Sequence, residues 1–275
     1  MKQHYNSSYI FRITLVATLG GLLFGYDTAV ISGTVDSINQ VFVQPQGLSE
    51  AAANSLLGFC VASALIGCII GGAMGGYLSN RFGRRNSLMI SALLFLISAI
   101  GSGWPELGLS AINPDGGIPV YLSGYIPEFV IYRIIGGVGV GLASMLSPMY
   151  IAEIAPAEIR GKLVSFNQFA IIFGQLMVYC VNYFIARSGD ALWLNSIGWR
   201  YMFASEAIPA ILFFGLLFSV PESPRWLIAR GETKRASDIL TRIMGKLQAE
   251  PALKEITRSL NNPEHANARL LMFGA

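Results

Sequence analysis

Long apolar stretches separated by short polar ones run through most of the chain. A helix that crosses a membrane needs about 20 mostly apolar residues, and six stretches come close to or exceed that length. They cover Tyr9–Ile31, Ala52–Leu78, Ser87–Trp104, Pro127–Tyr150, Leu163–Ile185 and Trp199–Val220. The pattern therefore predicts an all-α membrane protein built on a bundle of six transmembrane helices.

The pattern changes after the sixth stretch. Pro221–Pro224 ends it, and from there to about Leu260 apolar residues alternate with charged ones. Because proline suits the first turn of a helix, this segment is expected to form short cytoplasmic helices against the base of the bundle. Leu270–Ala275 is apolar again and is interpreted as the beginning of a seventh span, cut off. The expected domains are residues 1–220, the six-helix bundle, and residues 221–275, the helical linker with the start of that span.

The positions of Lys and Arg indicate how the chain lies in the membrane. The loops after the first and third spans contain neither residue, whereas the segments after the second, fourth and sixth spans contain several. These are Arg81, Arg84, Arg85, Arg160, Lys162, Arg225, Arg230, Lys234 and Arg235. Cytoplasmic loops carry an excess of positive residues, so both termini of the chain are expected on the cytoplasmic side.

The composition agrees with a membrane protein and argues against other classes. Charged residues make up 13% of the chain, about half their share in a typical soluble domain, and the mean hydropathy is +0.53. The net charge of +3 provides no patch for nucleic acid. The three cysteines lie in apolar segments and the two histidines near opposite ends, which predicts no disulfide framework and no metal site. No nucleophile–base pair is evident, so neither an enzyme nor a cofactor is expected.

Three ionisable residues stand inside the apolar spans: Asp27, Arg133 and Glu206. A charge at the centre of a bilayer costs roughly 2.5–3.5 kcal/mol on insertion scales, so such residues face one another, a water-filled cavity or a ligand. Asp27 and Arg133 belong to the first helices of two three-helix units, near mid-depth, which makes contact between them plausible. The contact could be a static salt bridge. If it is mobile, Arg133 keeps Asp27 ionised, and Asp27 takes up a proton when the contact breaks.

Glu206 lies three residues before Pro209 in the sixth span. Proline can kink a helix there and frees a carbonyl group. Two interpretations stay open for this carboxyl group. It is either a second proton acceptor or modulator of Arg133, or a simple partner for a neighbouring helix.

A polar stripe marks the fifth span. Gln168 and Gln175 are seven residues apart, close to two helical turns, so both point the same way, and Tyr179 and Asn182 roughly extend the stripe. It could form interhelical hydrogen bonds, or it could line a sugar cavity, since amides both donate to and accept from vicinal hydroxyls. Phe24, one turn before Asp27, could pack in the core or against lipid, or lie against the C–H face of a pyranose.

Several short motifs carry a family resemblance. Gly76 and the turn Asn80–Arg85 together match a signature that resembles the major facilitator superfamily, although Asn80 stands where Asp is commoner, which is expected to weaken the local charge network. Four segments are similar to the sugar porter family: Gly20–Asp27, Arg133–Gly141, Glu153–Gly161 and Pro221–Leu227. The glycines of the second segment follow no strand, so they are interpreted as points of close helix approach and not as a dinucleotide loop.

The resemblance implies a twelve-helix fold of two six-helix halves. The chain resembles the first half, a 3+3 inverted repeat, plus the cytoplasmic linker, and its expected partners are the missing second half, membrane lipids, a sugar and a proton. The implied activity is proton-coupled symport of a pentose or hexose, D-xylose first, by alternating access in the bacterial inner membrane. In this family symporters carry Asp at position 27, where facilitators commonly carry Asn.

The resemblance also assigns residues. Proton coupling is expected of Asp27, Arg133 and Glu206, and sugar binding of Phe24, Gln168 and Gln175. A cytoplasmic charge network, which would latch the two halves, is expected of Arg84, Arg85, Glu153, Arg160, Glu222 and Arg225. These six could equally form a solvated rim. Two alternatives to symport also stay open: a facilitative uniporter, and a half-transporter fragment that binds or scaffolds but moves nothing.

Overall fold

A computed structural model describes residues 5–107 and 122–260 of the chain. Six of its helical segments are long and apolar enough to cross a membrane, which confirms the predicted fold class. They run over Ser7–Gly33, Glu50–Phe82, Arg84–Gly103, Ile126–Ile154, Arg160–Ala186 and Ala191–Leu217. Most of the loop from Pro105 to Tyr125 and the expected start of a seventh span lie outside the described residues. The division into domains at residue 220 stays a prediction.

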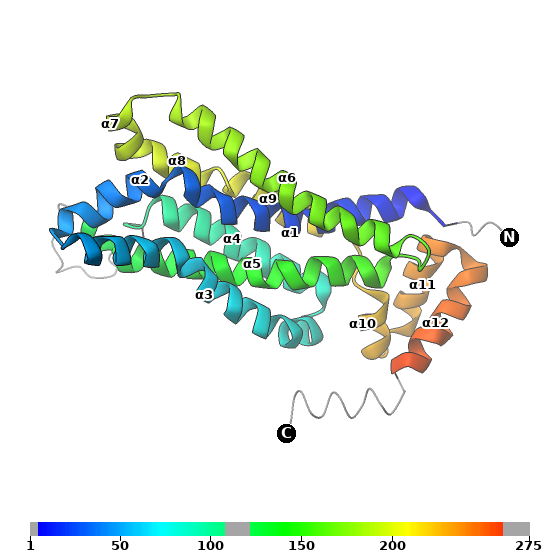
Figure 1. Ribbon diagram of the computed structural model, residues 1–275. Helices are drawn as coiled ribbons and strands as arrows, with labels where there is room; N and C mark the ends of the chain where they lie inside the picture. The colour runs from blue at the N-terminus through cyan, green and yellow to red at the C-terminus, as the bar shows by residue number, and fades with distance from the viewer. Residues whose placement is uncertain (1–4, 108–121, 261–275) are drawn as a thin grey trace, which may run out of the picture.

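The helices follow one another with short connections. In chain order they are α1 (Ser7–Val30), η1 (Ile31–Gly33), α2 (Val35–Ile38), η2 (Asn39–Val43), η3 (Gln44–Gln46), α3 (Glu50–Phe82), α4 (Arg84–Gly103), η5 (Leu122–Tyr125), α5 (Ile126–Ile154), α6 (Arg160–Ala186), α7 (Ala191–Trp193), η6 (Leu194–Gly198), α8 (Trp199–Ala204), α9 (Ala207–Leu217), α10 (Pro224–Ala229), α11 (Thr233–Met244) and α12 (Lys246–Leu260). The last three gather at one end of the bundle (Figure 1).

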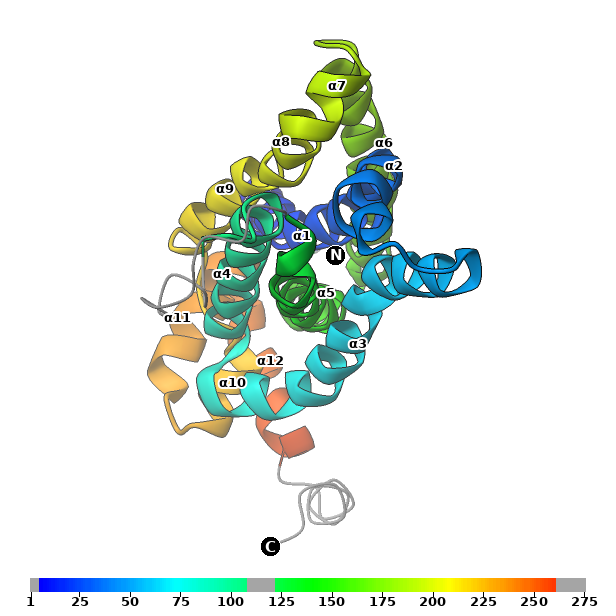
Figure 2. The same ribbon diagram turned by 90° about the vertical axis from the view of Figure 1, so that its left-hand side faces the viewer.

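The packing of the long helices repeats itself. Seen along the bundle, α5 lies inside a ring of the other helices (Figure 2). It packs on α3 and α4, while α1 packs on α6 and α9. If α1, α3 and α4 are matched in order with α5, α6 and α9, the packing of α5 on α3 and α4 corresponds to the packing of α1 on α6 and α9. This is the arrangement that two three-helix repeats give.

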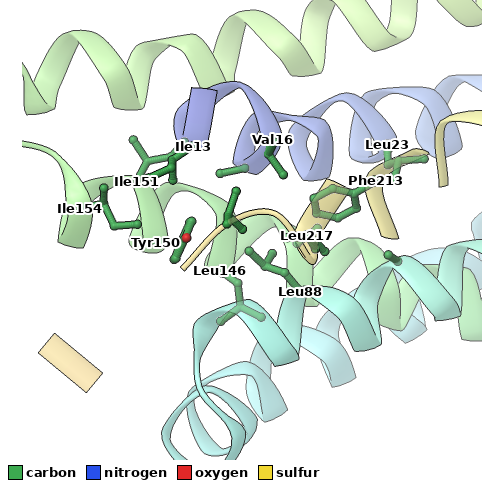
Figure 3. Close-up of a cluster of buried hydrophobic side chains, with 14 of the residues drawn as sticks. Ile13, Val16, Leu23, Leu88, Leu146, Tyr150, Ile151, Ile154, Phe213 and Leu217 are labelled. Carbon is green, nitrogen blue, oxygen red and sulfur yellow. The ribbon is translucent and has the colours of Figure 1, made fainter. Parts of the chain in front are cut away.

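The main apolar core joins five spans, α1, α4, α5, α6 and α9, with the linker helix α11. Side chains of α1, α4, α5 and α9 meet in its centre (Figure 3), among them Ile13, Val16, Leu88, Leu146, Tyr150, Phe213 and Leu217. Ile243 of α11 is fully buried in the same cluster. Its carbonyl also accepts the backbone N–H of Asn6, just before α1, at 2.8 Å. The linker helices are thus fixed to the base of the bundle through both side chains and backbone.

Two spans keep much of their apolar surface open. Only 22% of the most apolar window is buried in α3 and in α6, against 61% in α1 and α5. Large side chains such as Leu65 and Ile69 on α3 and Phe169 and Phe184 on α6 are exposed. In a membrane protein such surface faces lipid or another bundle. These two helices also occupy equivalent places in the repeat.

The sixth span differs from the predicted Trp199–Val220. It runs over Ala191–Leu217 and is interrupted between α8 and α9. Pro209 has no N–H to donate to the Ser205 carbonyl, and the N–H of Ile208 donates to it instead at 3.3 Å. The N–H of Glu206 likewise donates to Phe203, three residues earlier, at 3.2 Å. A tightened turn therefore places Glu206 at a helix break.

Candidate transport site

A buried ion pair joins the two central helices. Nη1 of Arg133 on α5 donates to Oδ1 of Asp27 on α1 at 2.7 Å, and the side chains are 2% and 1% exposed. The contact expected from the sequence is therefore present. Its geometry is a single hydrogen bond, weaker than a forked contact through two nitrogens, and Nε of Arg133 has no partner among the described residues.

The surroundings of Arg133 are aromatic. Its guanidinium carbon lies 5.6 Å from the ring centre of Phe203 on α8, and Phe203 packs edge-on against Phe129 and Trp199. In such apolar surroundings two opposite charges attract strongly, and removing one partner typically costs 3–5 kcal/mol. Asp27 is therefore the group that directly compensates the charge of Arg133.

Glu206 is the third charged residue of this site. Its side chain is 0% exposed, and neither carboxyl oxygen has a hydrogen-bond partner among the described residues. The charges of Asp27 and Arg133 both act on it. The proposed pairing with a neighbouring helix finds no hydrogen bond within the described chain. Both carboxyl oxygens are therefore buried and unpaired among the described residues.

Sequence reasoning missed one contact beside Glu206. The Tyr26 hydroxyl and the Ser205 hydroxyl lie 2.7 Å apart, and the Ser205 hydroxyl also donates to the Met202 carbonyl at 2.6 Å. The helix break is thus linked to α1 one residue before Asp27. Tyr26 was visible in the sequence as a polar group within a span, but its partner depends on how the kinked helix packs.

The three sugar-binding candidates lie on two adjacent helices. Phe24 is half-buried on α1, Gln175 is half-buried on α6, and Gln168 is exposed on α6. A Cβ added to Gly25 would lie 3.2 Å from the backbone nitrogen of Gln175, so Gln175 sits at the level between Phe24 and Asp27. No hydrogen bond of either glutamine side chain is found in the described part of the chain. Both amides are free to bind a ligand.

The end of the polar stripe behaves differently. Asn182 is buried, and its side-chain nitrogen donates to the carbonyl of Val30 on α1 at 3.2 Å. It therefore makes the interhelical hydrogen bond that was one of the two expectations. Tyr179 is 52% exposed. The stripe thus combines exposed side chains with one hydrogen bond between helices.

A second polar cluster forms at the end of the bundle where the linker helices lie, around the turn from α3 to α4. Gly83 makes this turn with φ +93°, a conformation that favours glycine. The carboxylate of Glu222 then accepts the backbone N–H groups of Arg84 at 2.9 Å, Arg85 at 3.2 Å and Ser223 at 2.8 Å. One buried carboxylate therefore holds the turn against the beginning of the linker.

Glu153 on α5 joins this cluster directly. Arg84 Nη2 donates to Oε1 of Glu153 on α5 at 2.9 Å, and the Ser223 hydroxyl donates to the other Glu153 oxygen. Arg84, Glu153 and Glu222 are thus brought together as expected. Arg160 and Arg225 form no ion pair among the described residues, but they line one pocket of about 310 Å³ with Glu153.

The stability of the protein should depend on pH because Glu222 is buried. Burial raises the pKa of Glu222 above its ordinary 4.5, opposed by N–H donors at Ser223, Arg85 and Arg84. A raised folded-state pKa means that its contribution is complete below about pH 4.5 and is lost as the pH rises through the folded-state pKa. Glu222→Gln cannot ionise and does not lose this contribution. Its unfolding temperature relative to wild type should therefore rise across that pH window, by about 2–4 °C for each kcal/mol of unfolding free energy that wild type loses.

The matched control is Glu255→Gln on α12, where the side chain is exposed and the difference from wild type should stay flat. Thermal unfolding of the purified protein at several pH values measures both variants. A Glu222→Gln difference that does not change with pH would contradict the role of burial.

The fold and the site together define the class of protein. Six spans in two three-helix repeats, with an ion pair buried between the first helices of each, are the architecture of a secondary transporter. The chain belongs to the sugar (and other) transporter family, whose model matches residues 13–273.

Individual relatives agree. The chain is 75% identical over 274 residues to the D-xylose-proton symporter of Escherichia coli strain K12, and 41% identical over 256 residues to the arabinose-proton symporter of Bacillus subtilis strain 168. These alignments cover 100% and 93% of this chain but 56% and 50% of the relatives. The chain thus spans about half the length of the curated relatives it matches, which are named as transporters and not as enzymes.

A solved structure shares the fold closely. The major facilitator superfamily proton:xylose symporter XylE, bound to 6-bromo-6-deoxy-D-glucose, superposes with a TM-score of 0.92 at 76% identity. The match covers 98% of this chain and 57% of that one. The resemblance seen in the motifs is therefore confirmed at the level of family and fold, and the chain is a multi-pass membrane protein.

Proposed function

We propose that this chain serves proton-coupled sugar symport by alternating access, with D-xylose as the first candidate substrate. The observation that carries the proposal is the buried Asp27–Arg133 bridge in a chain 75% identical to a D-xylose-proton symporter. A facilitator needs no carboxyl group that changes its charge. An acid held by one hydrogen bond inside a membrane is suited to take up and release a proton.

The steps follow from the contacts. A proton neutralises Asp27, and its bridge to Arg133 weakens. Sugar then binds between Gln168 and Gln175, with Phe24 against its apolar face. The bundle rocks to the inward-open state and releases sugar and proton. Glu206, whose two carboxyl oxygens have no hydrogen-bond partner in the described part of the chain, modulates Arg133 or takes a second proton, and no cofactor takes part.

Alternating access requires a second bundle that rocks against this one. The open apolar faces of α3 and α6 fit such a neighbour or lipid. The cluster of Arg84, Glu153 and Glu222 at the linker, with Arg160 and Arg225 beside it, acts as the cytoplasmic latch between the halves. We place the chain in the bacterial inner membrane with both termini in the cytoplasm, since the positive loops lie at that end.

Uptake by the protein as its gene encodes it tests the proposal. Reconstituted in liposomes, it should accumulate labelled xylose when the outside is acidic, and xylose should drive proton entry. Accumulation should collapse when a protonophore is added. Uptake that only equilibrates xylose and moves no proton would favour the facilitative uniporter. Xylose binding by titration calorimetry without any transport would favour the binding-only alternative.

A further inference from the structure

One buried hydroxyl group near the ion pair has no assigned role. Ser98 on α4 is 0% exposed, and its Oγ has no hydrogen-bond partner among the described residues. Helix serines usually donate to a carbonyl one turn earlier, as Ser63 and Ser144 do here at 2.8 Å and 2.9 Å. Leaving a buried hydroxyl unpaired is costly. Ser98 therefore holds a position that packing alone does not explain.

This hydroxyl group and the carboxylate of Asp27 both lie against Gly136. A Cβ added to Gly136, one turn after Arg133, would overlap Ser98 Oγ and would lie 3.4 Å from Oδ1 of Asp27. The hydroxyl group from α4 and the carboxylate from α1 thus both lie against Gly136 on α5. A side chain at this position would displace Ser98, so glycine permits the close approach. Ser98 and Asp27 make no hydrogen bond to each other while Arg133 binds Oδ1.

The charged and titratable groups around Asp27 come from three elements. Arg133 on α5 is in contact, Glu206 lies between α8 and α9 within range of its charge, and Cys68 on α3 is also within range. Arg133 can only donate and a thiol is a weak acceptor, so two acceptors are available near a protonated Asp27: the Glu206 carboxyl group and the Ser98 hydroxyl group. Ser98 is the one that lies against Gly136 together with Oδ1 of Asp27.

We propose that Ser98 is a positioning residue for the proton-loaded state of Asp27, an inference that rests on the proposed proton coupling. A proton from the external water bonds to the carboxylate and forms the neutral acid. The acid leaves Arg133, turns toward Ser98 along Gly136 and donates its O–H to Ser98 Oγ. The Ser98 proton turns to a carbonyl one turn earlier on α4. Arg133 stays charged and loses its carboxylate partner, while the Ser98 hydroxyl group, unpaired before, both accepts from the acid and donates to the carbonyl.

The test compares two serines of one helix. Ser98→Ala removes the acceptor, so the proton-loaded state loses one hydrogen bond and the pH of half-maximal proton-driven xylose uptake should shift by about one unit toward acid. Ser87→Ala is the control, because Ser87 is equally buried and unpaired but lies about 16 Å away along α4. Its pH profile should equal that of wild type.

Further readouts separate function from folding. Thermal unfolding and xylose exchange at equal pH on both sides should match in the two variants, because neither requires net proton uptake. If Ser98→Ala does not fold, Ser98→Cys replaces it, and its poorer acceptor should give a smaller acid shift. An unshifted profile in a coupled protein would overturn the role of Ser98 alone. A wild-type protein that moves no proton would overturn the proposed function as well.

Discussion

Asp27→Asn should abolish accumulation of sugar against a gradient while sugar exchange survives. Under the proposed symport, a difference of one pH unit supplies about 1.4 kcal/mol per proton, enough for about tenfold accumulation of a neutral sugar. Asn cannot carry the proton, so the inside-to-outside ratio should fall to about one. Xylose accumulation and counterflow exchange in the same liposomes measure the two effects.

The exchange assay also checks folding in this variant. Arg133 is 2% exposed, and an uncompensated buried charge is destabilising, although Glu206 lies within range of it. Surviving exchange shows that the site is intact. Asp36→Asn is the control, because Asp36 is an exposed residue of α2. This variant should accumulate sugar as wild type does. Wild-type accumulation by Asp27→Asn would remove Asp27 from the coupling mechanism.

Much of the fold could be predicted because apolar length alone identifies a span. The six helices and the charged linker follow from it. What hydropathy could not show is the interruption at Ser205 and Glu206, because it depends on the N–H that Pro209 lacks and on which carbonyls the neighbouring N–H groups then share. The sixth span also begins earlier than expected, at Ala191.

The candidate site also contains contacts that the sequence predicted and contacts that it could not predict. Contact between Asp27 and Arg133 was predictable, since two opposite charges inside apolar helices have few other partners. The contacts of Glu222 were not, because a carboxylate that binds the backbone N–H groups of a distant turn leaves no periodic signal in the sequence. Ser98 was missed for a related reason. A serine in an apolar helix is unremarkable until its neighbour across a glycine is known to be a carboxylate.

Gly137→Leu should prevent folding of the bundle. A Cβ at this position would overlap the carbonyl oxygen of Ala64 and lie 3.0 Å from the backbone nitrogen of Cys68, so α3 and α5 pack there backbone against backbone. Overpacking a core that can adjust costs about 1–3 kcal/mol. Here the obstacle is helix backbone, which cannot rotate away, so the loss should exceed that range. Size-exclusion chromatography and thermal unfolding of detergent extracts measure it.

The matched control is Gly215→Leu in α9. A Cβ at Gly215 meets no atom within 4 Å, and the residue is exposed. Both substitutions gain the same helix propensity, about 0.8–1 kcal/mol, so the difference between them reports packing alone. Gly215→Leu should be as stable as wild type or slightly more. Equal yields of folded protein from the two variants would mean that α3 can move away from α5, and the close approach inferred from Arg133–Gly141 would then not be required for the fold.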